Sequence, residues 1–276
     1  MISFTIRREG YPICEIMENV RTYGKAPFSL AVIHGGPGAA GEMSPVAREL
    51  CSAFGVLEPI QTKPSIKGQI EELRIVLEKY GNPPVILIGF SWGAWLSFIF
   101  AANHPALVKK LILVSCGPFE QKYATRVQET RVNRLDEKER MELESIYEIF
   151  VDPAVKDKST AFERFGALFS KADAYDPIKD ESESVDFRFD IFQGVWKEAE
   201  ELRRSGKLLE LGRCIQCPVL AIHGDYDPHP AEGVKDPLSL ILSDFRFILL
   251  KNCGHKPWME RQAKNEFYMI LKEELG

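Results

Sequence analysis

Residues 85–93 read VILIGFSWG, and this stretch decides how the rest of the chain is interpreted. Its first six residues form a continuous apolar run, which is typical of a parallel strand buried on both faces. Residues 94–103 continue with a helical composition. A G-x-S-x-G pattern between a strand and a helix describes a sharp, strained turn that lifts the serine hydroxyl above the sheet. We therefore expect Ser91 to be a nucleophile at the carboxyl end of a strand.

The two glycines of this turn have a steric explanation. The turn forces the Ser91 backbone into an unusual conformation, and Gly89 and Gly93 then approach neighbouring backbone so closely that a side chain would clash. A chance match of five residues in a loop is the alternative interpretation. The flanking strand and helix favour the functional one.

Four other apolar runs along the chain have the same character. None of them alternates, and they occupy residues 30–33, 111–114, 219–222 and 245–250. Runs of this kind favour parallel strands that are buried on both faces. Apolar residues recur at helical spacing in 66–80 and 267–275. Because strands that alternate with helices imply crossover connections, we predict an α/β fold with a mostly parallel sheet flanked by helices.

The N-terminal residues have a different pattern, in which apolar and polar side chains alternate. The apolar positions lie on both sides of Gly10-Tyr11-Pro12 and are Ile2, Phe4, Ile6, Ile13 and Ile16. Alternation around a turn signal predicts an antiparallel hairpin. We place this hairpin at an edge of the sheet.

The alternation of strands and helices stops between about residues 118 and 213, where no apolar strand run occurs. One helical face there carries Leu143, Ile146, Tyr147 and Phe150, and residues 187–209 also have a helical pattern. We predict a helical cap, residues 118–213, inserted into an α/β core domain that is formed by residues 1–117 and 214–276.

A serine hydroxyl is a weak nucleophile at neutral pH and needs a base within hydrogen-bond reach. His255 follows the last apolar run, in a loop expected to reach the carboxyl edge of the sheet, where ligands bind. Where a G-x-S-x-G turn joins a strand of a parallel sheet to a helix, the acid and then the histidine follow the serine in the chain. We therefore expect His255 to be the general base.

The other histidines fit this role less well. His34 precedes Ser91, and His104 is too near to it in the chain. His223 ends a predicted strand, and His229 lies between two prolines.

The acid is expected in the loop after the run 219–222. This loop contains two aspartates, Asp225 and Asp227. Aspartate also stabilises turns and helix starts, so one of the two is explained by local structure alone. The residues by themselves leave both aspartates open as the acid.

Acyl transfer develops negative charge on the former carbonyl oxygen, which backbone N–H groups can stabilise. The amide of Trp92, the residue after the serine, is the expected first donor. The loop 34–38, HGGPG, is expected to supply the second donor, which we assign to Gly36 with Gly35 as the alternative. A phosphate-binding loop is another reading of these glycines, but the Lys-Ser/Thr ending of a P-loop is absent.

The amino-acid composition favours a globular protein over a nucleic-acid-binding or membrane-spanning one. The 276 residues are 45% hydrophobic, which suits a sizeable core, and the net charge of −5 argues against nucleic acid as a partner. No stretch is long and apolar enough for a membrane span, and the N-terminus does not resemble a secretory signal, so we expect a cytoplasmic protein. We expect no cofactor and no metal.

The six cysteines are scattered along the chain, mostly inside apolar runs. This distribution predicts buried free thiols rather than a disulfide framework. Cys214 and Cys217 form a CxxC pair, but the chain lacks a second pair at metal-binding spacing.

Taken together, the serine turn, the HGGPG loop and the late histidine resemble the α/β-hydrolase superfamily. The HGGPG and Ser-Trp-Gly segments resemble its prolyl iminopeptidase branch in particular. The resemblance covers residues 2–115 and 218–276. Its G-x-x-D-x-x-P arrangement begins here at Gly224, which implies that Asp227 is the triad acid.

The chain also departs from the iminopeptidase branch. That branch has an Asp-Gln-Arg-Gly segment that is absent from residues 54–68. Its members bind the substrate amine with carboxylates of the cap. The cap predicted here is rich in acids, including Glu181, Glu183, Asp186 and Asp190, which we interpret as a solvated acidic surface.

The expected function is that of a serine hydrolase that acts on a small molecule or a short peptide. It would cleave a carboxylic ester or amide, or remove an N-terminal residue, through an acyl-enzyme on Ser91, His255 and Asp227. Carbon–carbon bond hydrolases share this triad and stay open as an alternative. A ligand-binding or signalling protein on the same fold is the alternative from another class, because a fold does not dictate a function. The sequence makes no prediction of the oligomeric state.

Overall fold

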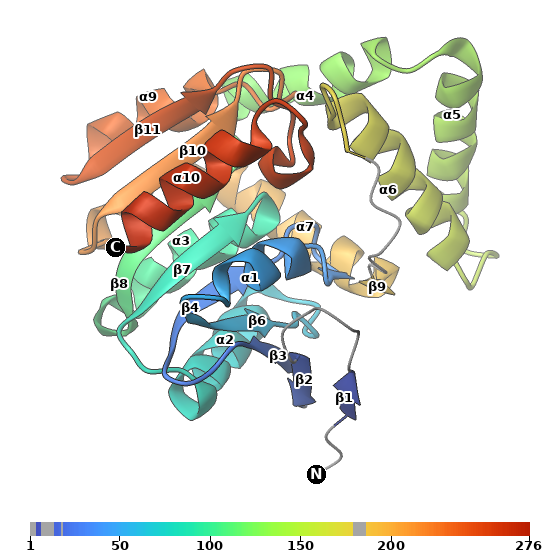
Figure 1. Ribbon diagram of the computed structural model, residues 1–276. Coiled ribbons are helices and arrows are strands. Elements are labelled where there is room, and N and C mark those ends of the chain that lie inside the picture. The colour runs from blue at the N-terminus through green and yellow to red at the C-terminus, as the bar shows by residue number, and fades with distance from the viewer. Residues whose placement is uncertain (1–3, 7–13, 18, 179–185) are drawn as a thin grey trace.

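The structure is a computed structural model that describes residues 4–6, 14–17, 19–178 and 186–276 (Figure 1). A nine-stranded sheet forms its centre, in the order β1-β2-β3-β6-β4-β7-β8-β10-β11. These strands are β1 (Phe4–Ile6), β2 (Cys14–Met17), β3 (Val20–Tyr23), β6 (Gly55–Pro59), β4 (Phe28–Ile33), β7 (Val85–Phe90), β8 (Val108–Val114), β10 (Val219–Gly224) and β11 (Phe245–Leu250).

The sheet has an antiparallel end and a parallel body. β1, β2, β3 and β6 pair antiparallel in succession, whereas all pairs from β6 to β11 are parallel. The antiparallel pairing of β1 with β2 confirms the predicted hairpin at the sheet edge. Ile2 and Ile13, which belonged to that prediction, lie outside the described residues.

Helices cover both faces of the sheet (Figure 1). On one face, α1 (Ser44–Leu50) and α10 (Lys264–Leu275) pack through a core that includes Val46 and Phe267. On the other face lie α2 (Ile66–Tyr80), α3 (Trp92–Asn103) and α9 (Glu232–Ile241). Short 3₁₀ turns occur at η1 (Pro105–Leu107), η2 (Leu211–Cys214) and η3 (Pro257–Met259). The predicted fold class, a mostly parallel sheet flanked by helices, is therefore confirmed.

The helix α3 shows why the segment after the serine turn is so apolar. Ten of its twelve residues are buried, since it crosses the sheet beneath other helices. A helix that is hydrophobic on all sides must be surrounded by protein. Its position directly after β7 fixes Ser91 at the carboxyl edge of the sheet, where the two elements meet.

The prediction that β11 is buried on both faces is wrong. β11 is the last strand of the sheet and pairs only with β10, and five of its six residues are partly or fully exposed. Leu249, for example, keeps 38% of its surface exposed. An edge strand has fewer covering elements than a central one, and a continuous apolar run does not by itself reveal this difference.

The expectation of buried cysteines holds only in part. Cys51, Cys116 and Cys253 are buried, but Cys214 is exposed and Cys217 is half-buried. All five of these cysteines are free thiols. The exposed position of Cys214 follows from its place at the end of the surface turn η2.

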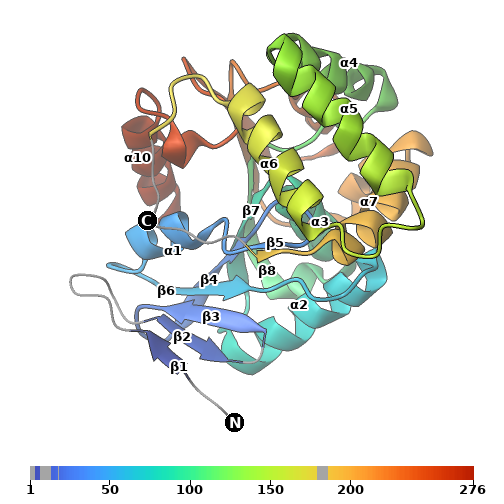
Figure 2. The same ribbon diagram turned by 90° about the vertical axis from the view of Figure 1, so that its right-hand side faces the viewer.

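Residues 118–213 contain α4 (Gln121–Asn133), α5 (Glu137–Val151), α6 (Ser159–Asp173), α7 (Phe189–Arg204) and α8 (Lys207–Glu210). Together, α4, α5 and α6 stand over the carboxyl edge of the sheet (Figure 2). A small cluster that includes Leu143, Ile146 and Leu168 joins α5 to α6. The strand β9 (Asp186–Phe187) pairs with β5 (Ala39–Ala40) in the loop after β4.

The helix α7 differs from the rest of this insertion, because its buried residues join the main core. Ile191, Val195 and Ala199 belong to the same apolar cluster as α2 and α3. The Glu198 carboxylate also accepts a hydrogen bond from the Ile66 amide at the start of α2, at 2.8 Å. The division into a core and a cap at residues 118 and 213 remains our proposal. Within that division, α7 anchors the cap to the core.

None of the helices in the described ranges combines the length and apolar character needed to cross a membrane.

Candidate active site

Ser91 occupies a strained turn between β7 and α3. Its backbone angles are φ 51° and ψ −114°, a region that non-glycine residues rarely adopt. The Ser91 amide donates to the Val114 carbonyl at 3.0 Å, which ties the turn to β8. A Cβ at Gly93 would overlap the carbonyl oxygens of Ile33 and His34, and one at Gly89 would overlap the Gly93 carbonyl. Both glycines are therefore required by close backbone contacts.

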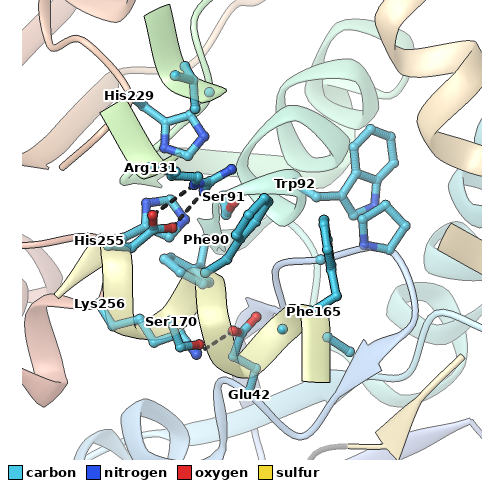
Figure 3. Close-up of a pocket in the computed structure, with 18 of the residues that line it drawn as sticks. Glu42, Phe90, Ser91, Trp92, Arg131, Phe165, Ser170, His229, His255 and Lys256 are labelled. Carbon is cyan, nitrogen blue, oxygen red and sulfur yellow. Dashed lines mark hydrogen bonds and ion pairs between the residues drawn. The ribbon is translucent and has the colours of Figure 1, made fainter. Parts of the chain in front are cut away.

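His255 lies in the loop after β11 and lines the same cavity as Ser91 (Figure 3). Its Nδ1–H donates to Asp227 Oδ2 at 2.7 Å. The Phe90 ring, which precedes the serine, packs against the imidazole with the ring centroids 4.8 Å apart. These two contacts fix both the tautomer and the tilt of the His255 ring, and they leave Nε2 available to the cavity.

Asp227, and not Asp225, contacts His255. The Asp225 carboxylate instead accepts from the Cys253 amide at 3.3 Å and lies 3.6 Å from the Lys251 ammonium group. Asp225 therefore joins the loop after β10 to the loop after β11. The role of Asp227 as the acid of a triad is carried forward as a proposal.

Three histidines surround the buried Asp227 carboxylate. Besides the bond from His255, Oδ1 accepts from the amide and the Nδ1–H of His229, at 2.9 and 2.8 Å. His223 Nε2 lies 3.6 Å from Oδ2. Burial alone would raise the pKa of Asp227, but the charges that the three histidines carry when protonated, and the hydrogen bond from His229, hold this pKa well below its ordinary value. The carboxylate is thus ionised at neutral pH.

His229 was set aside in the sequence analysis, yet it belongs to the site. Its ring lies 4.7 Å from the His255 ring and lines the cavity. Its place between two prolines and two residues after Asp227 was the signal that could have revealed it, since this spacing allows a side chain to turn back onto the aspartate. Burial lowers the pKa of His229 to about 4, so this ring is neutral at pH 7.

The pKa of His229 predicts an acid-sensitive contribution to stability. Between pH 6.5 and 4 the unfolded chain binds a proton at His229 that the folded protein does not, so stability falls as the pH falls through this window. We expect His229 to account for about 3 kcal/mol of the loss in unfolding free energy between pH 7 and pH 4.

Urea denaturation of the wild type and of His229→Asn at the two pH values measures this loss. The Asn amide can still donate to Asp227 but does not titrate. The variant should lose less stability on acidification by the stated amount. Equal losses in the two proteins would contradict the prediction.

The residues expected to supply the oxyanion donors, Gly36 and Trp92, line the same cavity as Ser91. Trp92 is the first residue of α3, so its N–H has no acceptor within the helix. Gly36 has φ 27° and lines the same cavity as Trp92. A Cβ at Gly35, the alternative donor, would overlap the Phe90 ring and the Glu42 carboxylate, which explains why a glycine is needed there.

A buried polar network that the sequence analysis missed supports this loop. His34 Nε2 accepts from the Gln61 amide at 3.3 Å, and the Gln61 side chain donates to the His34 carbonyl at 2.9 Å. The Trp92 indole donates to Gln61 Oε1 at 2.9 Å. Gln61 therefore joins the HGGPG loop to the start of α3. No local pattern around Gln61 signals this role, because its partners lie far away in the sequence.

Glu260 is a second residue that the sequence analysis missed. Its buried carboxylate accepts from the amides of Gly254 and Tyr175 at 3.0 and 2.9 Å, and from the Asp176 amide at 2.8 Å. The His255 amide donates to the Asp173 carbonyl at 2.9 Å in the same region. These bonds attach the His255 loop to the chain that follows α6.

The cavity above Ser91 has a volume of about 830 Å³. Figure 3 shows Ser91 and His255 on the core side and Phe165 of α6 on the insertion side. Aromatic rings form a large part of the wall, and the insertion contributes Tyr147, Phe150, Phe162, Phe169, Phe192 and Trp196 as well as Phe165. A cavity of this size with a mostly apolar surface is typical of small-molecule sites.

Asp227, His229 and His255 also form a group that could hold a metal ion, since their donor atoms lie within 4.8 Å of one another. The hydrogen bonds among the three already engage the carboxylate oxygens and both Nδ1 atoms. Hydrogen bonding therefore explains why these three side chains lie close together.

Of the four acids of the predicted cap named in the sequence analysis, Asp190 is the one whose side chain the structure describes. Glu181 and Glu183 lie outside the described residues, as does the side chain of Asp186. Asp190 pairs with Arg188 at 3.0 Å, and both side chains are exposed. The pairing of Asp190 fits its interpretation as a surface residue.

The comparisons with known proteins agree with this architecture. A family model described as the alpha/beta hydrolase fold matches residues 63–262, well over half of the chain. The chain belongs to the α/β-hydrolase family. It is accordingly a hydrolase of this family. No sequence among the curated proteins that were compared matches it.

Many solved structures have the same fold as this α/β hydrolase. The crystal structure of VinJ has a TM-score of 0.64 at 17% identity, covering 99% of this chain and 98% of the other. A 2-hydroxy-6-oxo-6-phenylhexa-2,4-dienoate hydrolase from Rhodococcus sp. strain RHA1 has a TM-score of 0.61 at 18% identity, with 99% of each chain covered. Proline iminopeptidase from Mycobacterium smegmatis has a TM-score of 0.59 at 17% identity, covering 99% and 97%. At these identities the likeness shows the fold alone.

Proposed function

We propose that this α/β hydrolase is a serine hydrolase that cleaves a carboxylic ester or amide through an acyl-enzyme. The observation that carries the proposal is the 2.7 Å bond from His255 to the ionised Asp227, at a cavity shared with Ser91 in its strained turn. A base oriented by a buried acid, in the same cavity as a nucleophile that a substrate can reach, is the arrangement that acyl transfer needs.

In the proposed reaction, Ser91 Oγ attacks the carbonyl carbon of the substrate while His255 Nε2 takes its proton. Asp227 stabilises the resulting imidazolium through the bond at Nδ1. The amides of Gly36 and Trp92 stabilise the oxyanion. His255 then gives its proton to the leaving group, and the acyl-enzyme forms. Water, activated by the same histidine, releases the acid and restores Ser91.

The aromatic wall supports an apolar group on at least one side of the scissile bond. Carbon–carbon bond hydrolases and peptidases with the same triad remain alternatives. A panel of aryl esters, aminoacyl arylamides and vinylogous diketones separates the three reactions. We expect the aryl esters to be turned over fastest, since their leaving groups need the least assistance. The free thiols at the five described cysteines fit the compartment that we propose, the cytoplasm.

A fluorophosphonate probe tests the nucleophile directly. We expect stoichiometric labelling of the folded protein, with the modified peptide mapped by mass spectrometry to Ser91. Ser170 is an internal control, because it lines the same cavity from α6 but has no base beside it in our assignment. Labelling at Ser170, or no labelling of folded protein, would overturn the proposal. Steady turnover after acylation separates a hydrolase from a binding protein that is acylated once.

A further inference from the structure

One wall of the cavity is a row of aromatic rings that leads away from Ser91. Trp95 follows Ser91 by four residues, about 6 Å along α3. The Trp95 ring stacks on the Trp196 ring of α7 with the centroids 6.3 Å apart, and Trp196 stacks in turn on Phe192 at 6.1 Å. All three rings line the cavity. This wall offers a slot for an extended apolar or planar group.

A buried cation, Arg203, lies next to this wall. The residue is 8% exposed, lines the cavity and holds its guanidinium 5.5 Å from the Trp95 ring. Its Nε–H donates to Gln121 Oε1 at 3.2 Å. In the part of the chain that the structure describes, the N–H groups of its two Nη atoms have no hydrogen-bond acceptor. A guanidinium has five such donors in a planar fork, so most of them are unused.

Glu200 is the acid paired with Arg203, but it does not accept a hydrogen bond from the guanidinium. Glu200 Oε1 lies 3.8 Å from Nη2, beyond hydrogen-bond distance, and 53% of the Glu200 side chain is exposed. Solvent weakens an ion pair of this kind. Burial also lowers the pKa of Arg203, which shows that its surroundings compensate the charge only in part.

The other described cations of the cavity wall have close acidic partners. Arg131 pairs with Asp173 at 2.6 Å, and Lys256 pairs with Glu42 at 2.8 Å. Arg203 therefore differs from both in having a buried charge and free donors. The free donors are not enclosed by protein atoms, so an anionic ligand in the cavity can supply their acceptors.

We propose that Arg203 binds a carboxylate of the substrate, so that the preferred substrate is an ester or amide with an apolar chain or ring that ends in a carboxylate. The inference rests on the proposed serine hydrolase activity and adds a substrate class to it. The fork of Arg203 can hold both carboxylate oxygens, while the rings of Trp95, Trp196 and Phe192 contact the apolar part. Ser91 then meets the carbonyl at the other end.

Matched esters test this proposal. One set contains the p-nitrophenyl hydrogen esters of adipic, suberic and sebacic acid, each compared with its methyl ester, which has the same chain without the charge. A second pair, 4-butyryloxybenzoate and its methyl ester, places the carboxylate on the leaving group. We expect the wild type to prefer the charged member of at least one pair by tenfold or more in kcat/KM, with an optimum in chain length if the acyl side is bound.

Variants at Arg203 should remove this preference. We expect Arg203→Gln to lower kcat/KM for the preferred carboxylate ester by about 10- to 100-fold. Turnover of the methyl ester should stay within about threefold of the wild type, which also shows that the variant folds. Arg203→Lys keeps the positive charge but lacks the planar guanidinium. Its kcat/KM for the carboxylate ester should lie between the values of the wild type and of Arg203→Gln.

Two neighbouring residues provide controls. Arg204→Gln removes an exposed cation that pairs with Glu201 and should leave the preference unchanged. Glu200→Gln removes the competing carboxylate beside Arg203 and should raise kcat/KM for the charged ester.

Three results would overturn the inference. They are equal rates for charged and neutral esters in the wild type, equal losses on both esters in Arg203→Gln, and the same loss in Arg204→Gln. Turnover of neutral esters in any of these cases leaves the serine hydrolase proposal standing. No turnover of any ester, together with no fluorophosphonate labelling, would instead reject the proposed function itself.

Discussion

Replacing Ser91 with alanine is expected to lower kcat on an activated ester by about 10⁶-fold, to the residual rate that the oxyanion donors and binding provide. The variant removes the attacking oxygen, and no other group in our mechanism can form the acyl-enzyme. The strained backbone at φ 51° is kept by the glycines at 89 and 93, so the fold should not depend on the hydroxyl. Initial rates of p-nitrophenol release at equal protein concentrations measure the effect.

Ser170→Ala is the matched control for this experiment. Ser170 lines the same cavity, is exposed, and has no role in the proposed chemistry. Its rate should stay within a fewfold of the wild type. A Ser91→Ala variant that retains its activity would show that catalysis uses a different group.

Replacing Asp227 with asparagine is expected to have the second largest effect, a loss of about 10⁴-fold in kcat. The Asn amide can donate to His255 Nδ1, which would shift the proton of the imidazole to Nε2. In this tautomer Nε2 cannot accept the proton of Ser91, although the ring stays in place. The same change removes the negative charge that stabilises the imidazolium.

Asp225→Asn separates the two aspartates of the loop. Asp225 contacts the Cys253 amide and Lys251 and not His255, so this variant should lose little activity. Thermal unfolding of both variants checks that Asp227→Asn acts on catalysis rather than on folding. If Asp225→Asn lost activity and Asp227→Asn did not, our assignment of the acid would be wrong.

The serine turn could be predicted because its requirements are local. A strand must end, a serine must adopt a strained conformation, and glycines must stand two residues away on either side. All these conditions lie within residues 85–93, and Ser91 adopts the expected geometry. The apolar run 245–250 likewise coincides with β11, although its position at the sheet edge was missed.

Other parts of the fold had weaker local signals. The strand β6 contains Glu58 and Pro59 and was not recognised, yet all five of its residues are buried. The Glu58 carboxylate accepts hydrogen bonds from the hydroxyls of Tyr23 and Ser44, at 2.6 and 2.9 Å. These hydrogen bonds lower the free-energy cost of burying the carboxylate. Because these partners are distant in the sequence, no window around Glu58 contains the reason for its burial.

The sequence by itself determined the fold class, the position of Ser91 and the histidine that faces the cavity with it. It did so because chain order and backbone sterics act over a few residues or along one strand. The family resemblance implied Asp227 rather than Asp225, and the tertiary structure showed that Asp227 is the one in contact with His255. Only the tertiary structure brought His229 onto the same carboxylate and placed Arg203 beside Trp95. These relationships depend on how separate elements pack, and long-range packing sets the surroundings of a side chain without leaving a pattern near it in the sequence.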